Sequence, residues 1–394
     1  MKFSKLSQLL LVSSIGLLVA TLFSACAITT IDYVFVASSS GIETFDADAT
    51  SGALRIGGPA VTTGVSSPVA LAVTPNYQNL YVANAGDKTI VHFAIGLTAG
   101  LTQKDKVTLG TTPVAITVNA AGSYLYVVSG TTSATLTSYP LSSDGSIGTA
   151  TSVVLSLPGY AGDTLVPTGV AVLANNAAVY VTLFDQSAYN PNGSTTSLAN
   201  PGWIFGFNVG SGGALTAAVN SPYQAGVKPS ALAADPTNRF VYATDFAQNQ
   251  MIGYTILNGS TLNFMTSGPF RTGDQPSAIV VDPRGLFIYV TNKLNSSVLA
   301  YSITLATGTP SSSVNVTGSQ VNATDTQPVA VIVDPSLGRF VYTANYLGNS
   351  LSGFKLDSTS GALSATQATP YPTGSKPTAL VSIPRGNHAV QAVE

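Results

Sequence analysis

Three short segments decide the fold of this chain: Pro276-Ser-Ala-Ile-Val-Val-Asp-Pro283, Ile288-Tyr-Val-Thr-Asn292 and Ser297-Val-Leu-Ala-Tyr301. Each is a run of small apolar, β-branched or aromatic residues, and the turn sequence Asp282-Pro-Arg-Gly285 follows the first run. Pro and Gly suit a tight turn there, because Pro presets one backbone dihedral and Gly accepts the unusual one. The pattern therefore predicts consecutive antiparallel strands.

The same pattern recurs along the chain. Each copy opens on a leading proline, and these prolines are Pro68, Pro113, Pro167, Pro229, Pro276, Pro328 and Pro377. Their spacings are 45, 54, 62, 47, 52 and 49 residues. Repeats of about this length, each with several short strands, are typical of β-propeller blades. We predict an all-β protein, a seven-bladed β-propeller of four-stranded antiparallel blades.

The two ends of the repeat region are incomplete in complementary ways. Tyr33–Ala37 has the sequence of a second strand without a first strand before it, and Pro377–Ile383 is a first strand left over. Joining them completes the seventh blade and closes the ring, which removes open sheet edges. A second candidate for the joining strand is His388–Val393, and the sequence leaves that choice open. We expect residues 27–394 to form a single propeller domain.

Composition excludes several classes of function. Only 8% of residues are charged, and 15 Lys and Arg against 17 Asp and Glu give a net charge of −2. Without a basic stripe to neutralise phosphates, a nucleic-acid partner is not expected. Two distant His and one Cys provide no zinc ligand set, and the Gly-rich segments lie between strands rather than before helices. We expect no metal and no cofactor.

The N-terminus carries an export signal. Lys2 and Lys5 precede an apolar stretch from Leu9 to Phe23, which is shorter than the roughly 20 residues of a membrane span. The apolar stretch ends near Cys26, the only Cys of the chain, in a sequence that resembles a bacterial lipobox. We predict a signal peptide over residues 1–26 and lipidation of Cys26. The alternative is a chance Cys at the end of an ordinary signal peptide.

This signal also predicts where the protein is located in the cell. We expect an exported protein of the cell envelope, anchored in a membrane by lipid. If the source has two membranes, the expected place is the outer membrane or the periplasm.

The repeat motifs resemble those of one family. The Tyr-Val-x-Asn strands, the Asp-Pro-x-Gly turns and the Ser-Gly-Ala-Leu loops at Ser51–Leu54 and Ser360–Leu363 look like the seven-bladed lactonase family, over residues 31–383. That family includes the propeller-type 6-phosphogluconolactonases and related cycloisomerases, and it shades into secreted Tyr-Val-Thr-Asn repeat proteins. The resemblance implies hydrolysis of a sugar lactone at the mouth of the central channel. It also implies His, Arg and Glu just after the leading prolines and at strand ends.

The catalytic part of the pattern does not carry over. Hydrolysis calls for a base that titrates near neutral pH and a cation beside the developing oxyanion. The residues that follow the leading prolines can supply neither, since they are Val69, Val114, Thr168, Ser230, Ser277, Val329 and Thr378. We expect His92 to pack in a third strand and His388 to lie near the C-terminus, and we assign catalysis to neither.

The remaining functional side chains gather on the loop-rich face beside the leading prolines. Arg271, Asp274 and Lys293 form the densest charged group and are the catalytic candidates, with solvated rim charges as the alternative. The ligand-binding candidates are Asp185, Tyr189, Trp203, Lys228, Asp245, Gln275, Tyr346 and Lys376. The first two belong to an insertion, Asp185–Pro201, that Trp203 follows. Long loops on a rigid scaffold often carry binding, and a tolerated surface insertion is the alternative.

Two functions stay open at this point. One is a lactone hydrolase of the resembled family with rearranged catalytic residues, acting on a small carbohydrate lactone. The other is a non-catalytic envelope scaffold that binds a glycan or a protein through its loop face.

Overall fold

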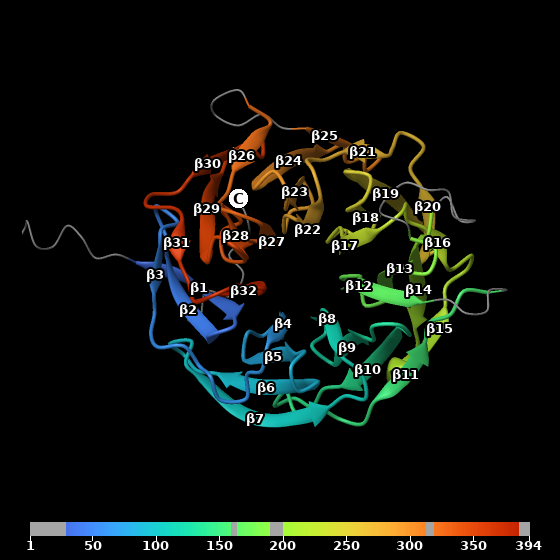
Figure 1. The fold of residues 1–394 in the computed structure, drawn as a ribbon, viewed down its shortest axis with the longest axis horizontal. Helices are drawn as coiled ribbons and strands as arrows, with labels where there is room; N and C mark the ends of the chain where they lie inside the picture. The colour runs from blue at the N-terminus through green and yellow to red at the C-terminus, as the bar shows by residue number, and fades with distance from the viewer. Residues whose placement is uncertain (1–28, 159–163, 190–199, 313–318, 386–394) are drawn as a thin grey trace, which may run out of the picture.

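Seven β-sheets stand in a closed ring around a central axis in the computed structural model, which describes residues 29–158, 164–189, 200–312 and 319–385 (Figure 1). We number the sheets as blades: blade 1 (β32, β1–β3), blade 2 (β4–β7), blade 3 (β8–β11), blade 4 (β12–β16), blade 5 (β17–β21), blade 6 (β22–β26) and blade 7 (β27–β31). The predicted all-β, seven-bladed propeller is confirmed.

Each blade runs outward through four antiparallel strands. The first, innermost strands are β4 (Pro68–Val73), β8 (Pro113–Val118), β12 (Leu165–Val172), β17 (Pro229–Ala234), β22 (Pro276–Val281), β27 (Pro328–Val333) and β32 (Ala379–Pro384). The second strands are β1 (Thr30–Ser38), β5 (Asn79–Asn84), β9 (Tyr124–Ser129), β13 (Ala178–Asp185), β18 (Phe240–Asp245), β23 (Phe287–Asn292) and β28 (Phe340–Asn345).

The outer half of each blade is less regular. The third strands are β2 (Gly41–Asp48), β6 (Thr89–Ile95), β10 (Thr135–Pro140), β14 (Gly202–Val209), β19 (Gln250–Leu257), β24 (Ser297–Ile303) and β29 (Ser350–Leu356). The fourth strands are β3 (Leu54–Ile56), β7 (Leu101–Thr108), β11 (Thr151–Val154), β15 (Leu215–Ala217), β20 (Thr261–Phe264), β25 (Pro310–Ser312) and β30 (Leu363–Ala365). In blades 4 to 7 a further short segment pairs with the third strand: β16 (Tyr223–Gln224), β21 (Phe270–Arg271), β26 (Val321–Ala323) and β31 (Tyr371–Pro372).

The leading prolines mark a break in the strand ladder. In six blades the register between first and second strands shifts directly after the proline, for example between Pro276 and Ala278. A proline has no N–H to give to the ladder, so a bulge is the place where a strand tolerates it. Pro167 differs from the others because β12 already begins at Leu165, which places this proline inside the strand at its bulge.

The ring closes within blade 1. β1 pairs antiparallel with β32, from Asp32 opposite Pro384 to Ala37 opposite Ala379. Tyr33–Ala37 is therefore the second strand of the closing blade. The competing candidate, His388–Val393, lies outside the described residues, as do Cys26 and the rest of the predicted signal peptide.

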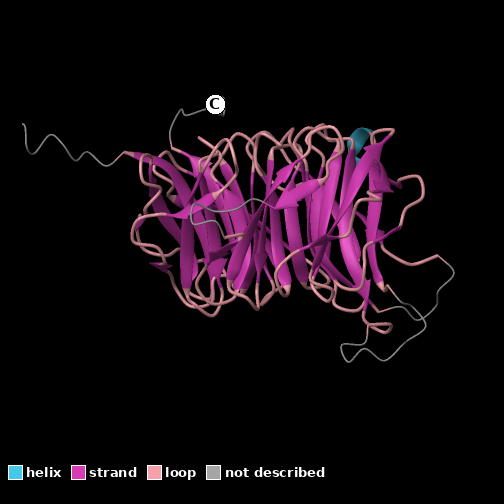
Figure 2. Ribbon diagram, turned by 90° about the horizontal axis from the view of Figure 1, so that it is seen from above, coloured by secondary structure: helices cyan, strands magenta, loops and turns pink. Residues whose placement is uncertain are grey.

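The antiparallel strands define two faces of the ring (Figure 2). At the mouth face the first strands begin and the second strands end. At the turn face lie the turns between first and second strands and the loops between third and fourth strands, including the short 3-10 turn η1 (Ser211–Gly213) at the upper edge in Figure 2. Among the described residues, no helix is long and apolar enough to cross a membrane.

Candidate functional site

A repeated backbone contact builds the mouth face. The residue after a second strand donates its N–H to the carbonyl of the residue before the leading proline of the same blade. This contact joins Phe246 to Lys228 at 2.9 Å, Lys293 to Gln275 at 2.8 Å and Tyr346 to Gln327 at 2.8 Å. The contact takes this form in blades 2, 3, 5, 6 and 7 and brings two rim residues of one blade together. In blades 5, 6 and 7 these pairs carry the cations, amides and rings.

Two of the predicted carboxylates hold this backbone in place. Asp245 is fully buried, and its carboxylate accepts N–H bonds from Val227 at 2.8 Å and from Lys228 at 3.0 Å. Asp185 is also buried and accepts N–H bonds from Thr164 at 3.1 Å and from Ser187 at 2.9 Å. Both oxygens of Asp245 are thus engaged with the main chain. Asp185 and Asp245 therefore fix the backbone of the mouth face, which positions the neighbouring side chains.

Lys228 is the most unusual group of the mouth face. Its Nζ lies 5.1 Å from the ring centre of Phe184, 4.8 Å from that of Tyr189 and 5.2 Å from that of Phe246. The first two rings also meet edge to face, with centres 5.6 Å apart. Burial of the amine, and then the charge of Lys293, lower the pKa of Lys228 below its ordinary value. The result is a half-buried cation among rings at the junction of blades 4 and 5.

The three catalytic candidates do not form one ion-paired group. Arg271 is exposed on β21, and Asp274 accepts hydrogen bonds from the side-chain amides of Asn249 at 3.2 Å and Asn295 at 3.0 Å. Within the described residues, the ion pairs are His92–Asp105 and Arg284–Asp282, neither of which includes a candidate. Lys293 is the member of the group that acts electrostatically on Lys228.

Gln275 and Lys376 hold equivalent places before the leading prolines of blades 6 and 1. Both have a left-handed backbone, with φ of 56° and 54°. Their N–H groups donate to Asn249 Oδ1 and Asn349 Oδ1, each at 2.8 Å, in the turn of the preceding blade. The Nζ atom of Lys376 lies 5.9 Å from the ring centre of Tyr346. Tyr346 and Lys376 therefore repeat, more loosely, the cation and ring pairing of Lys228.

Trp203 belongs to a different environment. It lies on β14 and packs against the apolar cluster between blades 3 and 4, where its indole N–H is buried without a hydrogen-bond partner in the described part of the chain. Of the two residues proposed from the insertion, only Tyr189 has its ring beside the amine of Lys228. Residues 190–199 lie outside the described residues.

Three of the seven positions after the leading prolines carry hydroxyls that join neighbouring blades. Ser230 Oγ donates to the carbonyl of Pro276 at 2.6 Å, and Ser277 Oγ donates to that of Pro328 at 2.7 Å. Thr378 Oγ1 makes the same bond to the carbonyl of Pro68 at 2.7 Å. At these three positions, where the resemblance implies catalytic side chains, the hydroxyls are engaged in bonds between the innermost strands.

His92 is occupied elsewhere. Its Nδ1 contacts Asp105 Oδ1 at 2.5 Å, its Nε2 contacts the side-chain amide of Asn79 at 2.8 Å, and its ring stacks on Tyr81. It lies on β6 and is buried, as the sequence predicts for a third-strand residue. No group of three or more metal-ligating side chains occurs in the described ranges.

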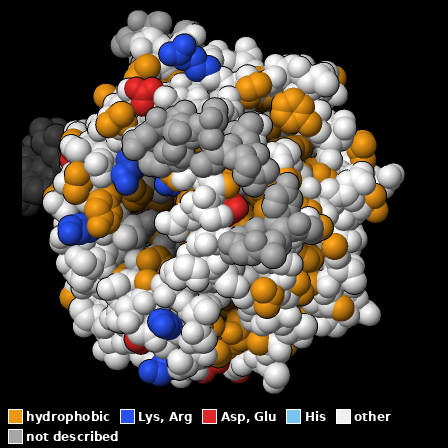
Figure 3. Space-filling view, turned by 45° about the vertical axis from the view of Figure 1, so that its right-hand side comes forward, with side chains coloured by type: hydrophobic (Ala, Val, Ile, Leu, Met, Phe, Trp, Pro, Cys, Tyr) orange, Lys and Arg blue, Asp and Glu red, His pale blue; other side chains and the backbone are white. Residues whose placement is uncertain are grey.

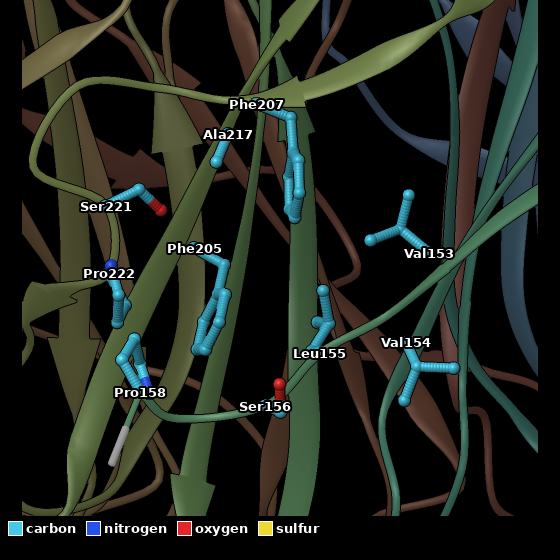
Figure 4. Close-up of a pocket in the computed structure, with 10 residues that line it drawn as sticks. All are labelled: Val153, Val154, Leu155, Ser156, Pro158, Phe205, Phe207, Ala217, Ser221 and Pro222. Atoms are coloured by element: carbon cyan, nitrogen blue, oxygen red, sulfur yellow. The ribbon is translucent and has the colours of Figure 1, made fainter.

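A small apolar cavity of about 160 Å³ opens between blades 3 and 4, away from the mouth rim (Figure 4). Its lining is Val153, Val154, Leu155, Ser156, Pro158, Phe205, Phe207, Ala217, Ser221 and Pro222. Figure 3 brings this side of the ring forward and shows hydrophobic side chains on a surface with few charges. The cavity has no titratable lining residue, so it offers no group for acid–base chemistry.

Sequence reasoning missed the two phenylalanines of the Lys228 cluster. Phe184 directly precedes Asp185 and Phe246 directly follows Asp245, so both flank a strand end. An aromatic ring beside a predicted rim residue is a signal that could have found them. Their convergence on one amine depends on the packing of blade 4 against blade 5.

The fold and the site can be compared with known proteins. The periplasmic gluconolactonase PpgL of Pseudomonas aeruginosa superposes with a TM-score of 0.72 at 18% sequence identity, covering 90% of this chain and 99% of that one. A proposed 6-phosphogluconolactonase from Bacteroides uniformis gives a TM-score of 0.73 at 16% identity, with 90% and 100% covered. A second one, from Bacteroides fragilis, gives 0.72 at 18% identity, with 91% and 99% covered.

At these identities the structural likeness concerns the fold. No curated protein matches the sequence. The family model described as "Lactonase, 7-bladed beta-propeller" matches residues 25–163 and 215–392, which is most of the chain. The protein therefore belongs to the seven-bladed lactonase family.

Proposed function

We propose that this protein hydrolyses a small sugar lactone at its mouth face, beside Lys228. The observation that carries the proposal is the half-buried amine of Lys228, ringed by Phe184, Tyr189 and Phe246, in a chain of the lactonase family. When water adds to a lactone carbonyl, negative charge develops on the carbonyl oxygen. A cation held in a partly dry site stabilises that charge far better than one in bulk water.

The reaction then needs only modest further help. Water adds to the carbonyl carbon, the ring C–O bond breaks, and the proton lost by the water ends on the ring oxygen, which leaves as a hydroxyl. The product is a hydroxy acid. Lys228 holds the developing oxyanion, and Lys293 adds a second positive charge nearby. Because sugar lactones also open spontaneously in water, stabilisation of the oxyanion alone can produce measurable acceleration.

The competing function is a binding scaffold for a glycan or a protein. The observation in its favour is that Ser230, Ser277 and Thr378, at the positions where the family resemblance implies catalysis, are engaged in bonds between blades. A rim with cations beside rings can bind a sugar without turning it over.

An activity panel separates the two functions. The purified mature protein is given five- and six-membered sugar lactones, and acid release is followed at constant pH against the spontaneous rate. We expect release above that rate for at least one lactone. If the protein accelerates none of them but binds a lactone or a glycan in calorimetry, the scaffold function replaces the hydrolase.

We further propose that the protein is exported and held in the cell envelope by lipid on Cys26. The support is the charged and apolar leader that ends at the only Cys of the chain. One protein of similar fold is also described as periplasmic. Metabolic labelling with a fatty-acid analogue should mark the wild type but not Cys26→Ser. An unlabelled wild-type protein that is soluble without detergent contradicts the anchor.

A further inference from the structure

The described chain begins at the turn face. Ala49, in the loop between β2 and β3, donates its N–H to the carbonyl of Thr29 at 2.8 Å, and Arg385 donates to the carbonyl of Ile31, also at 2.8 Å. The opposite end of β1 lies at the mouth face, where Ser39 donates to the carbonyl of Ser375 at 2.9 Å. An anchor attached before Thr29 is therefore joined to the ring at its turn face.

The tether is too short to reach around the ring. Three Cα-to-Cα steps separate Cys26 from Thr29, which span at most about 11 Å. β1 has nine residues, and at about 3.3 Å per residue it is roughly 30 Å long from one face to the other. A lipid on Cys26 can therefore hold the turn face at a membrane but cannot bring the mouth face there.

Cations surround the point where the chain leaves. Arg55 and Arg385 of blade 1 and Arg339 and Lys355 of blade 7 are all exposed. The two blades adjoin, since Tyr342 of blade 7 donates its hydroxyl to the carbonyl of Gly52 of blade 1 at 2.8 Å. None of the four cations takes part in an ion pair within the described ranges.

Arg339 differs from the corresponding arginine of blade 5. Arg239 donates to the carbonyl of Leu305 in the next blade at 2.6 Å. No hydrogen bond holds the guanidinium of Arg339 in the described part of the chain. Instead, Arg339 and Lys355 line a recess of about 400 Å³ with Asp357, Ser358 and Ser364 among its other residues.

Two carboxylates near these cations already accept backbone hydrogen bonds. Asp357 accepts the N–H groups of Thr359 at 3.0 Å and Ser360 at 2.8 Å, and these bonds lower its pKa. Asp48 accepts the N–H of Ser51 at 2.8 Å. Three carboxylates lie beside the four cations: exposed Asp357 and half-buried Asp46 and Asp48, of which Asp46 lies opposite Arg55. The cations still outnumber them, which favours an anionic surface as the partner.

Exposed leucines lie on both faces of the ring, and the position of the anchor indicates which of them can reach a membrane. Leu97 is 87% exposed at the tip of a turn-face loop in blade 2, next to blade 1. Leu257 and Leu305 are 47% exposed on the turn face of blades 5 and 6. Leu294 is 64% exposed, but it lies at the mouth face. Only the turn-face leucines lie on the side that the anchor draws toward lipid.

We propose that the turn face rests on an anionic phospholipid bilayer, with Arg339 and Lys355 binding phosphate headgroups and Leu97 entering the interface. The mouth face then points away from the membrane, open to soluble ligands. This proposal rests on the lipidation of Cys26 proposed above. It does not depend on whether the mouth hydrolyses a lactone.

Single engineered cysteines test the orientation, since Cys26 is the only native Cys and is blocked when acylated. Leu97→Cys and Leu294→Cys in the full lipidated protein are labelled with an environment-sensitive fluorophore and reconstituted into phosphatidylglycerol-containing vesicles with nitroxide-labelled headgroups. We expect quenching at position 97 and little at position 294. Acylated protein with equal quenching at both, or with more at position 294, overturns the proposal. Absence of acylation in the intact mass overturns the anchor itself.

Charge reversal tests the headgroup contact. In the full chain carrying Cys26→Ser, the pair Arg339→Glu and Lys355→Glu should weaken binding to anionic vesicles by roughly tenfold or more. The control is Lys106→Glu, an exposed cation on β7, which should bind as the parent protein does. If the parent binds neutral and anionic vesicles equally, or if the reversed pair binds as the parent does, a headgroup role for Arg339 and Lys355 is contradicted.

Discussion

At Asp32, two buried carboxyl groups meet at the junction of blades 7 and 1. Asp32 is fully buried, and Ser336 donates its hydroxyl to Asp32 Oδ1. Asp334 accepts N–H bonds from Arg339 and Phe340, both at 2.6 Å. Burial, and then the negative charge of Asp334, raise the pKa of Asp32 to about 8. Asp334 has the better hydrogen bonds to its charged form, so Asp32 is the partner that keeps a proton.

This pair predicts that stability depends on pH. The pKa of Asp32 in the fold is above the value of about 4 for an unfolded aspartate. The folded protein therefore holds an extra proton between these values, and its stability falls as pH rises from about 4 to about 8. We expect the denaturant midpoint of the wild type to fall steadily from pH 5 to pH 8.

Asp32→Asn should flatten this dependence, because the amide stays neutral throughout. Asp46→Asn, at a half-buried position on the neighbouring strand β2, is the control and should keep the wild-type slope. The carboxylates with lowered pKa, such as Asp325 and Asp357, change stability in the opposite sense and at lower pH. A wild-type midpoint that does not change across this range contradicts the assignment.

At the scale of the element, a tyrosine of the second strand joins blades 2, 4, 5, 6 and 7 to the next blade. Tyr242 donates its hydroxyl to the carbonyl of Gly308 at 2.6 Å, and Tyr289 donates to that of Gly361 at 3.1 Å. The acceptors lie in loops between the third and fourth strands of the following blade. The repeated Tyr of the sequence is thus an inter-blade contact, buried on both sides. Blade 3 departs from the rule, because the hydroxyl of Tyr126 is buried without a partner among the described residues.

Substitution of a bonded tyrosine and of Tyr126 by phenylalanine provides a matched pair of variants. Tyr289→Phe leaves the buried carbonyl of Gly361 without its donor, which should cost about 1–3 kcal/mol of unfolding free energy. Tyr126→Phe removes a hydroxyl that has no partner within the described ranges, and it should cost little or be stabilising. Denaturant unfolding of both variants measures the difference. Equal losses at the two positions contradict the inter-blade role.

The sequence predicts the strands better than it predicts the contacts between blades. The leading prolines and the Tyr-Val strands predict seven blades because each element has its own local pattern. The sequence leaves two candidates for the closing strand, Tyr33–Ala37 and His388–Val393, and the structure pairs the first with β32. Phe184, Lys228 and Phe246 come together only because blade 4 packs against blade 5. Likewise, no local pattern shows that Ser277 donates to Pro328 in the next blade. Contacts between blades are properties of the ring.

At the scale of the molecule, closure by β32 and β1 holds the ring. Without that pair, two sheet edges and the apolar faces of blades 7 and 2 would meet water. Leu380 of β32 packs into the same apolar cluster as Val34, Val36 and Phe340, so the closing strand belongs to the core as well as to the ladder.

Deleting residues 377–394 should therefore give an aggregating or protease-sensitive product. The matched control deletes only residues 386–394, which leaves β32 whole and should melt like the full protein. Thermal melting and limited proteolysis of both truncations provide the comparison. If the longer deletion melts like the full protein, the closing strand has been misplaced.

The central claim, that the mouth face performs lactone hydrolysis through Lys228, is tested most directly by kcat/KM for the best lactone substrate. The comparison is between wild type, Lys228→Ala and the distant control Lys106→Ala, all shown to be folded by circular dichroism. Losing a cation at the developing oxyanion should lower kcat/KM by about 100-fold or more in Lys228→Ala. Lys106→Ala should match the wild type. Wild-type kcat/KM in Lys228→Ala would contradict the claim.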